Sequence, residues 1–234
     1  MNLTWSVGTH PGRVRSNNED RLHPLSAGRG KSLLAAVADG MGGAVGGEVA
    51  SRLAIEAATK SGDLTVTERV SIANEAVYEE SLHNPDLAGM GTTLTLAEIG
   101  DGMLRLGHVG DSRCYRFRED ELTLLTHDHT MAYEQLEAGT ITADEATQHP
   151  QRHVLTRALG LLPVIDVDSS EEPLEKGDRF LLCSDGVNGM LGDTKIQEIL
   201  GRGTPEEAVW ELIEEANLAG GYDNVTVVIV DVDA

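Results

Sequence analysis

Apolar and polar residues follow one another along this chain in blocks that predict strands and helices. The run LLAAVA at residues 33–38 ends at an Asp-Gly pair, which predicts a short buried strand followed by a turn. From about Gly46 to Ala58, small and apolar residues recur at helical spacing. A second helix is predicted from the same spacing, and its apolar face carries Val66, Val70, Ala73 and Val77.

The pattern changes to period two between Thr92 and Thr126. Extended segments follow one another there, separated by short turns: TLTLAEI, MLRLGHV, RCYRF and LTLLT. A parallel crossover needs a dozen residues or more, so connections as short as these join antiparallel neighbours. The segment therefore predicts an antiparallel meander.

The remainder of the chain is mixed as far as Arg157 and then becomes regular. Strands are predicted for PVIDVDS at 163–169, DRFLLCS at 178–184 and VTVVIVDV at 225–232. A capping box with proline at the first helical position, residues 204–207, predicts a further helix. The strands outnumber those that the helices could cover in a doubly wound sheet, and the meander is antiparallel. We therefore expect an α+β fold, a four-layer α-β-β-α sandwich with two central antiparallel sheets flanked by helices. One domain over residues 1–234 is the simplest account.

Composition excludes several classes of function. With 39 Asp plus Glu against 18 Lys plus Arg, the surface would repel a nucleic-acid backbone. No apolar stretch has the length of a signal peptide or a membrane span, so we expect a cytoplasmic protein without membrane contact. A single active domain needs no partner, so we also expect a monomer. Cys114 and Cys183 lie in apolar runs without a second metal ligand nearby, which favours buried, reduced thiols.

Aspartates stand at the ends of the predicted strands. They are Asp39, Asp111, Asp185 and Asp223. A carboxylate beside an apolar run is costly to desolvate unless a cation or hydrogen bonds compensate it. Oxygen-only ligation suits Mg²⁺ or Mn²⁺ rather than zinc. Each aspartate alone is equally well explained as a turn or capping residue, but the matching contexts VADG and CSDG favour a shared ion.

The glycines after Asp39 fit the same interpretation. Glycine removes a side chain where the backbone must approach an ion closely, so the Gly40 carbonyl can ligate beside Asp39. Arg15 precedes the acidic pair Glu19–Asp20, and its planar guanidinium can donate two parallel hydrogen bonds to a phosphate. An ordinary surface charge is the alternative explanation of Arg15.

Together these segments resemble the metal-dependent protein serine/threonine phosphatases of type 2C, the PPM family, in their compact bacterial form. The motifs occur in one order along the chain: RSNNED, VADGMGG, MGTT, HVGDSR, DHT, CSDG and GGYDNVT. The resemblance spans Gly12 to Val230, and residues 131–153 resemble the flap insertion of bacterial members.

The resemblance implies hydrolysis of phosphoserine and phosphothreonine in proteins by a binuclear Mg²⁺ or Mn²⁺ centre that activates a bridging water. Asp39 would bridge the two ions with Gly40 on the second, and Asp185 and Asp223 would hold the first. Glu19 and Asp20 would act through water, Asp111 would belong to a weaker third site, and Arg15 would bind the phosphate. Substrates would be targets of a serine/threonine kinase.

One departure from the family pattern concerns proton transfer. Where many members carry a histidine shortly after the metal-binding Asp-Gly, this chain has Ala44. That histidine would protonate the leaving alkoxide, so water, the substrate or another histidine such as His129 would have to replace it. The alternative function is a phosphopeptide-binding or regulatory domain with impaired catalysis. His149 and Arg152 are candidates for substrate contact from the flap. His149 and His153 lie in QHPQRHV near a predicted helix start, where histidines more often have a structural role.

Overall fold

Two antiparallel sheets form the centre of the molecule. The computed structural model describes residues 1–60 and 62–233, and the side chains of residues 43–45 lie outside that description. The first sheet contains, in spatial order, β10 (Glu121–Leu124), β9 (Arg113–Arg118), β12 (Arg179–Cys183), β13 (Val225–Asp233), β1 (Asn2–His10) and β3 (Gly28–Gly30). The second contains β11 (Asp168–Pro173), β8 (Met103–Val109), β7 (Leu94–Gly100), β4 (Leu33–Ala38) and β2 (Arg21–His23). A two-stranded ribbon joins β5 (Gly40–Met41) to β6 (Gly91–Thr92).

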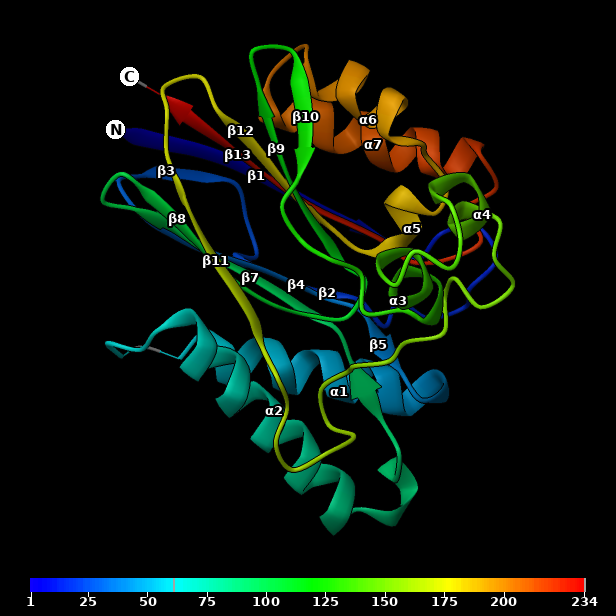
Figure 1. The fold of residues 1–234 in the computed structure, drawn as a ribbon. Coiled ribbons are helices and arrows are strands. Elements are labelled where there is room, and N and C mark those ends of the chain that lie inside the picture. Colours follow the sequence, from blue (N-terminus) through cyan, green and yellow to red (C-terminus); the bar gives the residue numbers. More distant parts are fainter. Residues whose placement is uncertain (61, 234) are drawn as a thin grey trace.

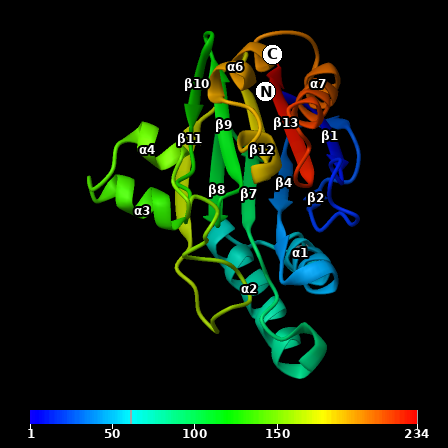
Figure 2. The same cartoon turned by 90° about the vertical axis from the view of Figure 1, so that its right-hand side faces the viewer.

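Helices cover the outer face of each sheet (Figure 1). On the second sheet lie α1 (Gly43–Ala58) and α2 (Val66–His83), followed by the 3₁₀ turn η1 (Pro85–Leu87). On the first sheet lie α5 (Asp185–Asn188), α6 (Asp193–Leu200) and α7 (Pro205–Leu218). The helices α3 (Met131–Glu137) and α4 (Ala143–Thr147) stand to one side of both sheets (Figure 2).

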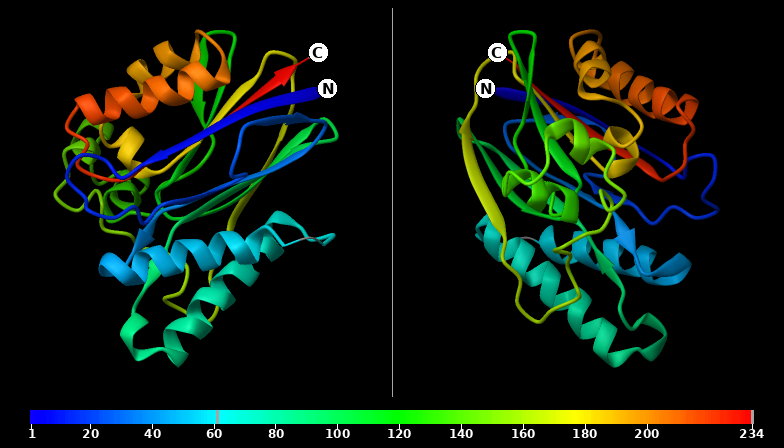
Figure 3. Two further views of the ribbon diagram at one scale, coloured as in Figure 1. Left: turned by 180° about the vertical axis from the view of Figure 1, so that it is seen from behind. Right: turned by 45° about the vertical axis from the view of Figure 1, so that its right-hand side comes forward.

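Three apolar interfaces hold these layers together. Buried residues of both sheets, such as Ile99 and Val230, pack between them. A second cluster, with Val77 and Leu96, joins α1 and α2 to their sheet, and a third, with Leu181 and Leu212, joins α6 and α7 to the other. Three interfaces require four layers, which confirms the predicted α-β-β-α sandwich. Figure 3 shows the two helical layers on opposite sides of the sheets.

Most predicted elements are confirmed. The run at 33–38 forms β4, and the second predicted helix is α2, which begins at a capping box between Thr65 and Glu68. The capping box between Thr204 and Glu207 begins α7, and the last predicted strand is β13. None of the described helices combines the length and apolar character needed to cross a bilayer.

The predicted meander is wrong at one turn. β7 pairs with β8 and β9 with β10, but β8 and β9 belong to different sheets, so the Gly-Asp-Ser turn carries the chain from one sheet to the other. Gly110 has φ 113°, and a Cβ there would lie 2.5 Å from the Thr93 side chain. A turn this tight can join two strands of a hairpin or two strands of stacked sheets. The pairing of β9 with β12 and of β8 with β7 decides between these possibilities.

One further prediction needs correction, and one strand was not predicted. The strand predicted at 163–169 begins only at Asp168. The residues before it form a loop, in which Val164 is exposed while Ile165 and Val167 pack against the cluster beneath α1 and α2. Asp168 Oδ1, at the start of that strand, accepts a hydrogen bond from Arg157 Nη1 at 2.7 Å. The sequence interpretation also missed β1, which pairs along its whole length with β13, from Asn2–Asp233 to His10–Val225. Leu3, Trp5 and Val7 alternate with polar residues in this segment, a period-two pattern that the sequence interpretation passed over.

Candidate metal and phosphate site

The strand-end aspartates converge because the sheet registers bring those ends together. Asp39 follows β4 and Asp111 follows β8, and both strands lie in the second sheet. Asp185 follows β12 and Asp223 precedes β13, and these strands are neighbours in the first sheet. Pairs such as Val37–Thr95 and Cys183–Val227 place all these ends at the same edge of the sandwich. Each sheet therefore contributes two aspartates to one place.

A cavity of about 840 Å³ lies at this edge, and we call it the carboxylate cavity. Of the residues predicted from the sequence, its walls contain Arg15, Glu19, Asp39, Gly40, Asp111, Arg152, Asp185 and Asp223. A larger hollow of about 1150 Å³ lies between β1, β3 and the start of α7, but none of the predicted site residues lines it. The chemistry therefore points to the carboxylate cavity.

The acidic groups of this cavity repel one another. Burial, followed by the charges of Asp20, Asp185, Asp111 and Asp223, raises the pKa of Asp39 well above its usual value. Burial and the neighbouring Asp185 likewise raise the pKa of Asp111. Carboxylates crowded in this way favour either protons or divalent cations, and the donor atoms are all oxygens.

Asp20 lies beneath the cavity instead of on its wall. It is 1% exposed, and Ser184 Oγ donates a hydrogen bond of 2.7 Å to its Oδ2. Its Oδ1 is buried without a hydrogen-bond partner. Burial raises the pKa of Asp20 to about 7. An unpaired buried oxygen next to a crowd of carboxylates is what a bound cation or its water would satisfy, so the residues present fit a divalent ion.

Glycines bring the backbone to the carboxylates. A Cβ on Gly40 would lie 2.1 Å from the Gly47 carbonyl oxygen and 2.8 Å from that of Glu19. A Cβ on Gly47 would lie 2.1 Å from Glu19 Oε2. The start of α1, the Asp39–Gly40 turn and the Glu19 segment can pack this closely only without side chains. This explains the glycines that follow Asp39.

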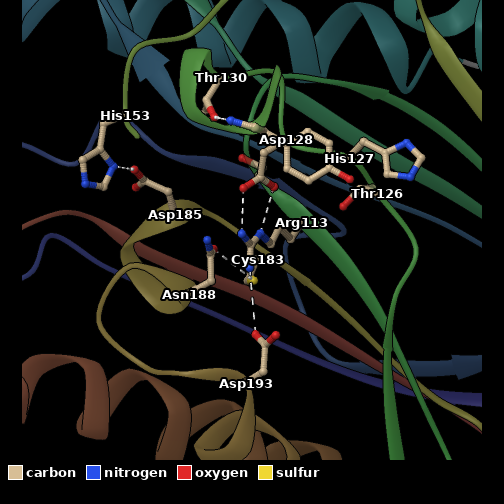
Figure 4. A network of polar contacts seen from close by, with 12 residues as sticks. Arg113, Thr126, His127, Asp128, Thr130, His153, Cys183, Asp185, Asn188 and Asp193 are labelled. Atoms are coloured by element: carbon tan, nitrogen blue, oxygen red, sulfur yellow. Dashed lines mark hydrogen bonds and ion pairs between the residues drawn. The ribbon is translucent and has the colours of Figure 1, made fainter. Parts of the chain in front are cut away.

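One carboxylate of the cavity is paired with an arginine, and another lies close to a histidine. Arg15 Nη2 donates to Asp223 Oδ2 at 2.7 Å, and His153 Nδ1 lies 3.5 Å from Asp185 Oδ2 (Figure 4). Among the described residues, no group of three or more His, Cys, Asp or Glu side chains is already arranged to hold a metal ion. An ion bound here would therefore compete with Arg15 and His153 for these oxygens.

The segment resembling a flap contributes Arg152 to the cavity wall but not His149. His149 is partly exposed, and its Nδ1 accepts a hydrogen bond from the Gln151 amide at 3.1 Å. His153, which we assigned to a structural role by default, lines the cavity, as does Tyr222 between Gly221 and Asp223. Neither carries a sequence signal beyond its place beside a predicted site residue.

A polar network ties the base of the flap to the turn that carries Asp111 (Figure 4). The Arg113 guanidinium donates two hydrogen bonds to Asp128, at 2.8 and 2.7 Å. The His129 amide donates to the Gly110 carbonyl at 2.8 Å, and the Gly110 amide donates to His129 Nδ1 at 3.0 Å. Sequence reasoning did not assign these roles, because partners that lie 15 or more residues apart have no local pattern.

The structure places His129, the suggested proton donor, away from the carboxylate cavity. His129 is 2% exposed, its Nε2 lies 3.1 Å from Asp168 Oδ2, and it does not line the carboxylate cavity. Burial lowers its pKa. His129 is therefore not positioned to protonate a leaving group, and that suggestion is wrong. Ala44 lies in the first turn of α1, but its side chain falls outside the described part of the structure.

Comparison with known proteins places this geometry in a family. The protein phosphatase 2C profile matches residues 7–203. The serine/threonine protein phosphatase PstP of Mycobacterium tuberculosis is 42% identical over 98% of this chain, which spans 45% of the length of PstP. The serine/threonine phosphatase stp of Listeria monocytogenes is 35% identical over 96% of this chain and 94% of its own length.

Solved structures agree with these sequence relatives. A crystal structure of PstP from M. tuberculosis covers 100% of both chains with a TM-score of 0.92 and 39% identity. A second, of the PstP catalytic domain in complex with two manganese ions, covers 100% of this chain and 99% of its own, with a TM-score of 0.88 and 37% identity. The predicted family and fold are thereby confirmed: the chain belongs to the protein phosphatase 2C family, beside bacterial serine/threonine phosphatases.

Proposed function

We propose that this chain is a metal-dependent protein serine/threonine phosphatase, which hydrolyses phosphoserine and phosphothreonine in proteins phosphorylated by a kinase. The observation that carries the proposal is the carboxylate cavity, where Arg15 and the strand-end aspartates from two sheets meet. Within the proposal, residues 1–234 form a single catalytic domain and residues 131–153 its flap. The PstP catalytic domain with two manganese ions supports the use of Mn²⁺ or Mg²⁺.

The residues that would hold two ions are those with oxygen atoms on the cavity wall. Asp39 would lie between them, the Gly40 carbonyl would serve one, and Asp185 and Asp223 the other. Glu19 and the buried Asp20 would act through water. When bound, two divalent ions lower the pKa of a water and neutralise charge on the phosphoryl oxygens. Asp111 would complete a weaker third site.

Arg15 would bind and orient the phosphate. Its guanidinium is more than half exposed and is fixed at the cavity by its bond to Asp223, with Glu19 and Asp39 contributing to the negative field around it. Once cations neutralise Asp223, the same planar fork is available to a phosphomonoester dianion, to which it can donate two hydrogen bonds. The attacking water and the leaving oxygen would then be held on opposite sides of phosphorus.

The leaving alkoxide needs a proton, and no imidazole is available at position 44. His129 is buried away from the cavity, whereas His153 lines it, so water in the open cavity or His153 would deliver the proton. This arrangement favours substrates with good leaving groups. A phosphopeptide-binding module with impaired turnover remains the second candidate on the strength of this one substitution.

The test is phosphate release from p-nitrophenyl phosphate and from a phosphothreonine peptide, with Mn²⁺, with chelator, and after metal is added back. A phosphatase releases phosphate from both substrates, and chelator abolishes release reversibly. Tight binding of the peptide without release from either substrate would instead support the binding module. Absence of both would refute the proposal.

A further inference from the structure

A run of exposed apolar residues follows the flap. Leu161, Leu162 and Val164 are 45%, 61% and 79% exposed, and Pro163 between them is exposed as well. We call residues 161–164 the apolar loop; it crosses beside α2 before the chain enters β11 (Figure 1). Single exposed apolar residues are ordinary, but a contiguous run of four marks a surface that contacts something.

The apolar loop is held in place from below. Asn74 of α2 is 2% exposed, and its Nδ2 donates to the Leu162 carbonyl at 3.0 Å. Its Oδ1 accepts a hydrogen bond of 2.9 Å from the Gly160 amide. Leu159 pairs with Thr92 through two backbone hydrogen bonds of 2.9 and 3.2 Å. Because this support already fixes the backbone, a ligand would not have to order the loop when it binds.

The apolar loop continues the wall of the carboxylate cavity. Met41 lines the cavity, and a Cβ on Gly91 would lie 2.7 Å from Met41 Cε and 3.4 Å from Leu161 Cδ2. The side chains of Met41 and Leu161 therefore both lie against Gly91. Leu155, a few residues before the loop, also lines the cavity. A chain that leaves the cavity on this side runs directly onto the apolar loop.

The charge of the protein favours an apolar contact for its substrate. At a net charge of −21, the surface repels a phosphopeptide, whose phosphate alone carries about −1.5 to −2. The apolar loop has no charged side chain, so contact with it gains free energy by apolar burial, which offsets part of this repulsion and does not weaken in salt. We propose that the apolar loop binds an apolar side chain of the phosphoprotein substrate close to the phosphorylated residue. This inference rests on the proposed function.

The test compares two phosphothreonine peptides, one with leucines on both sides of the phosphothreonine and one with serines in their place. The variant is the double substitution Leu162→Ser and Val164→Ser. The control is Leu218→Ser, since Leu218 is equally exposed at 63% but lies on α7, on the opposite outer layer. We measure kcat/KM for both peptides and for p-nitrophenyl phosphate, which is too small to reach the loop. Affinity is measured separately with phosphonate versions of the peptides, which cannot be hydrolysed.

The unmodified protein should prefer the leucine peptide by roughly tenfold in kcat/KM and in affinity, as expected for burial of one aliphatic side chain. The double variant should lose this preference while its p-nitrophenyl phosphate activity stays the same, and Leu218→Ser should behave like the unmodified protein. No preference in the unmodified protein, or a preference that survives the double substitution, would overturn the proposal.

Two further results separate the alternatives. If light scattering shows a dimer that the double substitution dissociates, a second copy of the chain covers the loop and the proposal is wrong. If no substrate is hydrolysed, the proposed phosphatase function fails, yet the affinities for the phosphonate peptides still decide whether the loop binds an apolar side chain.

Discussion

Replacement of Gly47 by alanine tests whether close glycine packing holds the proposed metal ligands. The new Cβ would lie 2.1 Å from Glu19 Oε2 and 2.8 Å from the Gly40 carbonyl oxygen. The carboxylate of Glu19 can turn away because it ends a flexible side chain. Gly40 cannot, since it is backbone that already lies against the Gly47 carbonyl, and therefore the turn after Asp39 must shift.

Two opposing effects set the size of the change in stability. Alanine is a better helix former than glycine by about 1 kcal/mol, and Gly47 lies within α1. Overpacking a close contact typically costs about 1–3 kcal/mol. We therefore expect the free energy of unfolding of the metal-free protein to fall by no more than about 2 kcal/mol. Displacement of groups that support a metal ligand typically weakens metal affinity about 10- to 100-fold, so Mn²⁺ binding should suffer far more than folding.

The assay is the Mn²⁺ concentration that gives half-maximal hydrolysis of p-nitrophenyl phosphate, with Mn²⁺ affinity from calorimetry and stability from urea unfolding. Gly46→Ala is the matched control: it lies in the same helix, and its Cβ would meet only Met90, at 3.2 Å from the Met90 Cβ. Gly46→Ala should leave the Mn²⁺ requirement unchanged. Equal Mn²⁺ requirements for Gly47→Ala and the unmodified protein, or equal increases in both variants, would refute the reasoning.

Other predictions follow from the same cavity. Asp39→Asn should reduce turnover by more than the roughly 10- to 100-fold typical of supporting residues, and a variant with near-normal turnover would contradict the proposed metal site. Arg15→Ala should mainly raise KM for p-nitrophenyl phosphate and Arg15→Lys should recover only part of the loss, whereas an unchanged KM would mean that another residue holds the phosphate. Ala44→His should raise kcat more on a phosphothreonine peptide than on p-nitrophenyl phosphate, by up to the roughly 10²- to 10⁴-fold of a general acid; equal changes would show that position 44 does not face the leaving group. In the presence of chelator, burial raises the pKa of Asp20 from 3.8 to about 7. The protonated carboxyl group therefore stabilises the folded state, and this contribution to the free energy of unfolding is lost as pH rises from about 4 to 7. Asp20→Asn should remove up to about 4 kcal/mol of this decrease in the free energy of unfolding, measured by urea unfolding at each pH. An unchanged dependence of the free energy of unfolding on pH would assign it to other groups.

The sequence alone was sufficient for the elements that local patterns specify. The apolar run before Asp39, the capping box at Thr204 and the apolar face of α2 were each predicted and are each present. The family was also predictable, because its motifs occur in order along the chain and the family profile matches it. The place of the aspartates at strand ends followed from the same patterns, since an apolar run that stops at Asp-Gly marks the end of a strand wherever that strand pairs.

Only the tertiary structure decided which strands are neighbours and what surrounds each site residue. The turn at Asp111 looked like a hairpin but crosses between sheets, and β1 was missed although it lies inside one, between β13 and β3. His153 reaches Asp185, Arg15 reaches Asp223, and Asp20 is buried without a partner for one oxygen. The residues before β11 matched a strand but form a loop beside α2, with Val164 exposed and Ile165 and Val167 packed against the core. In each case the deciding contact joins residues far apart along the chain, and periodicity reports only which side of an element is apolar, not which distant surface covers it.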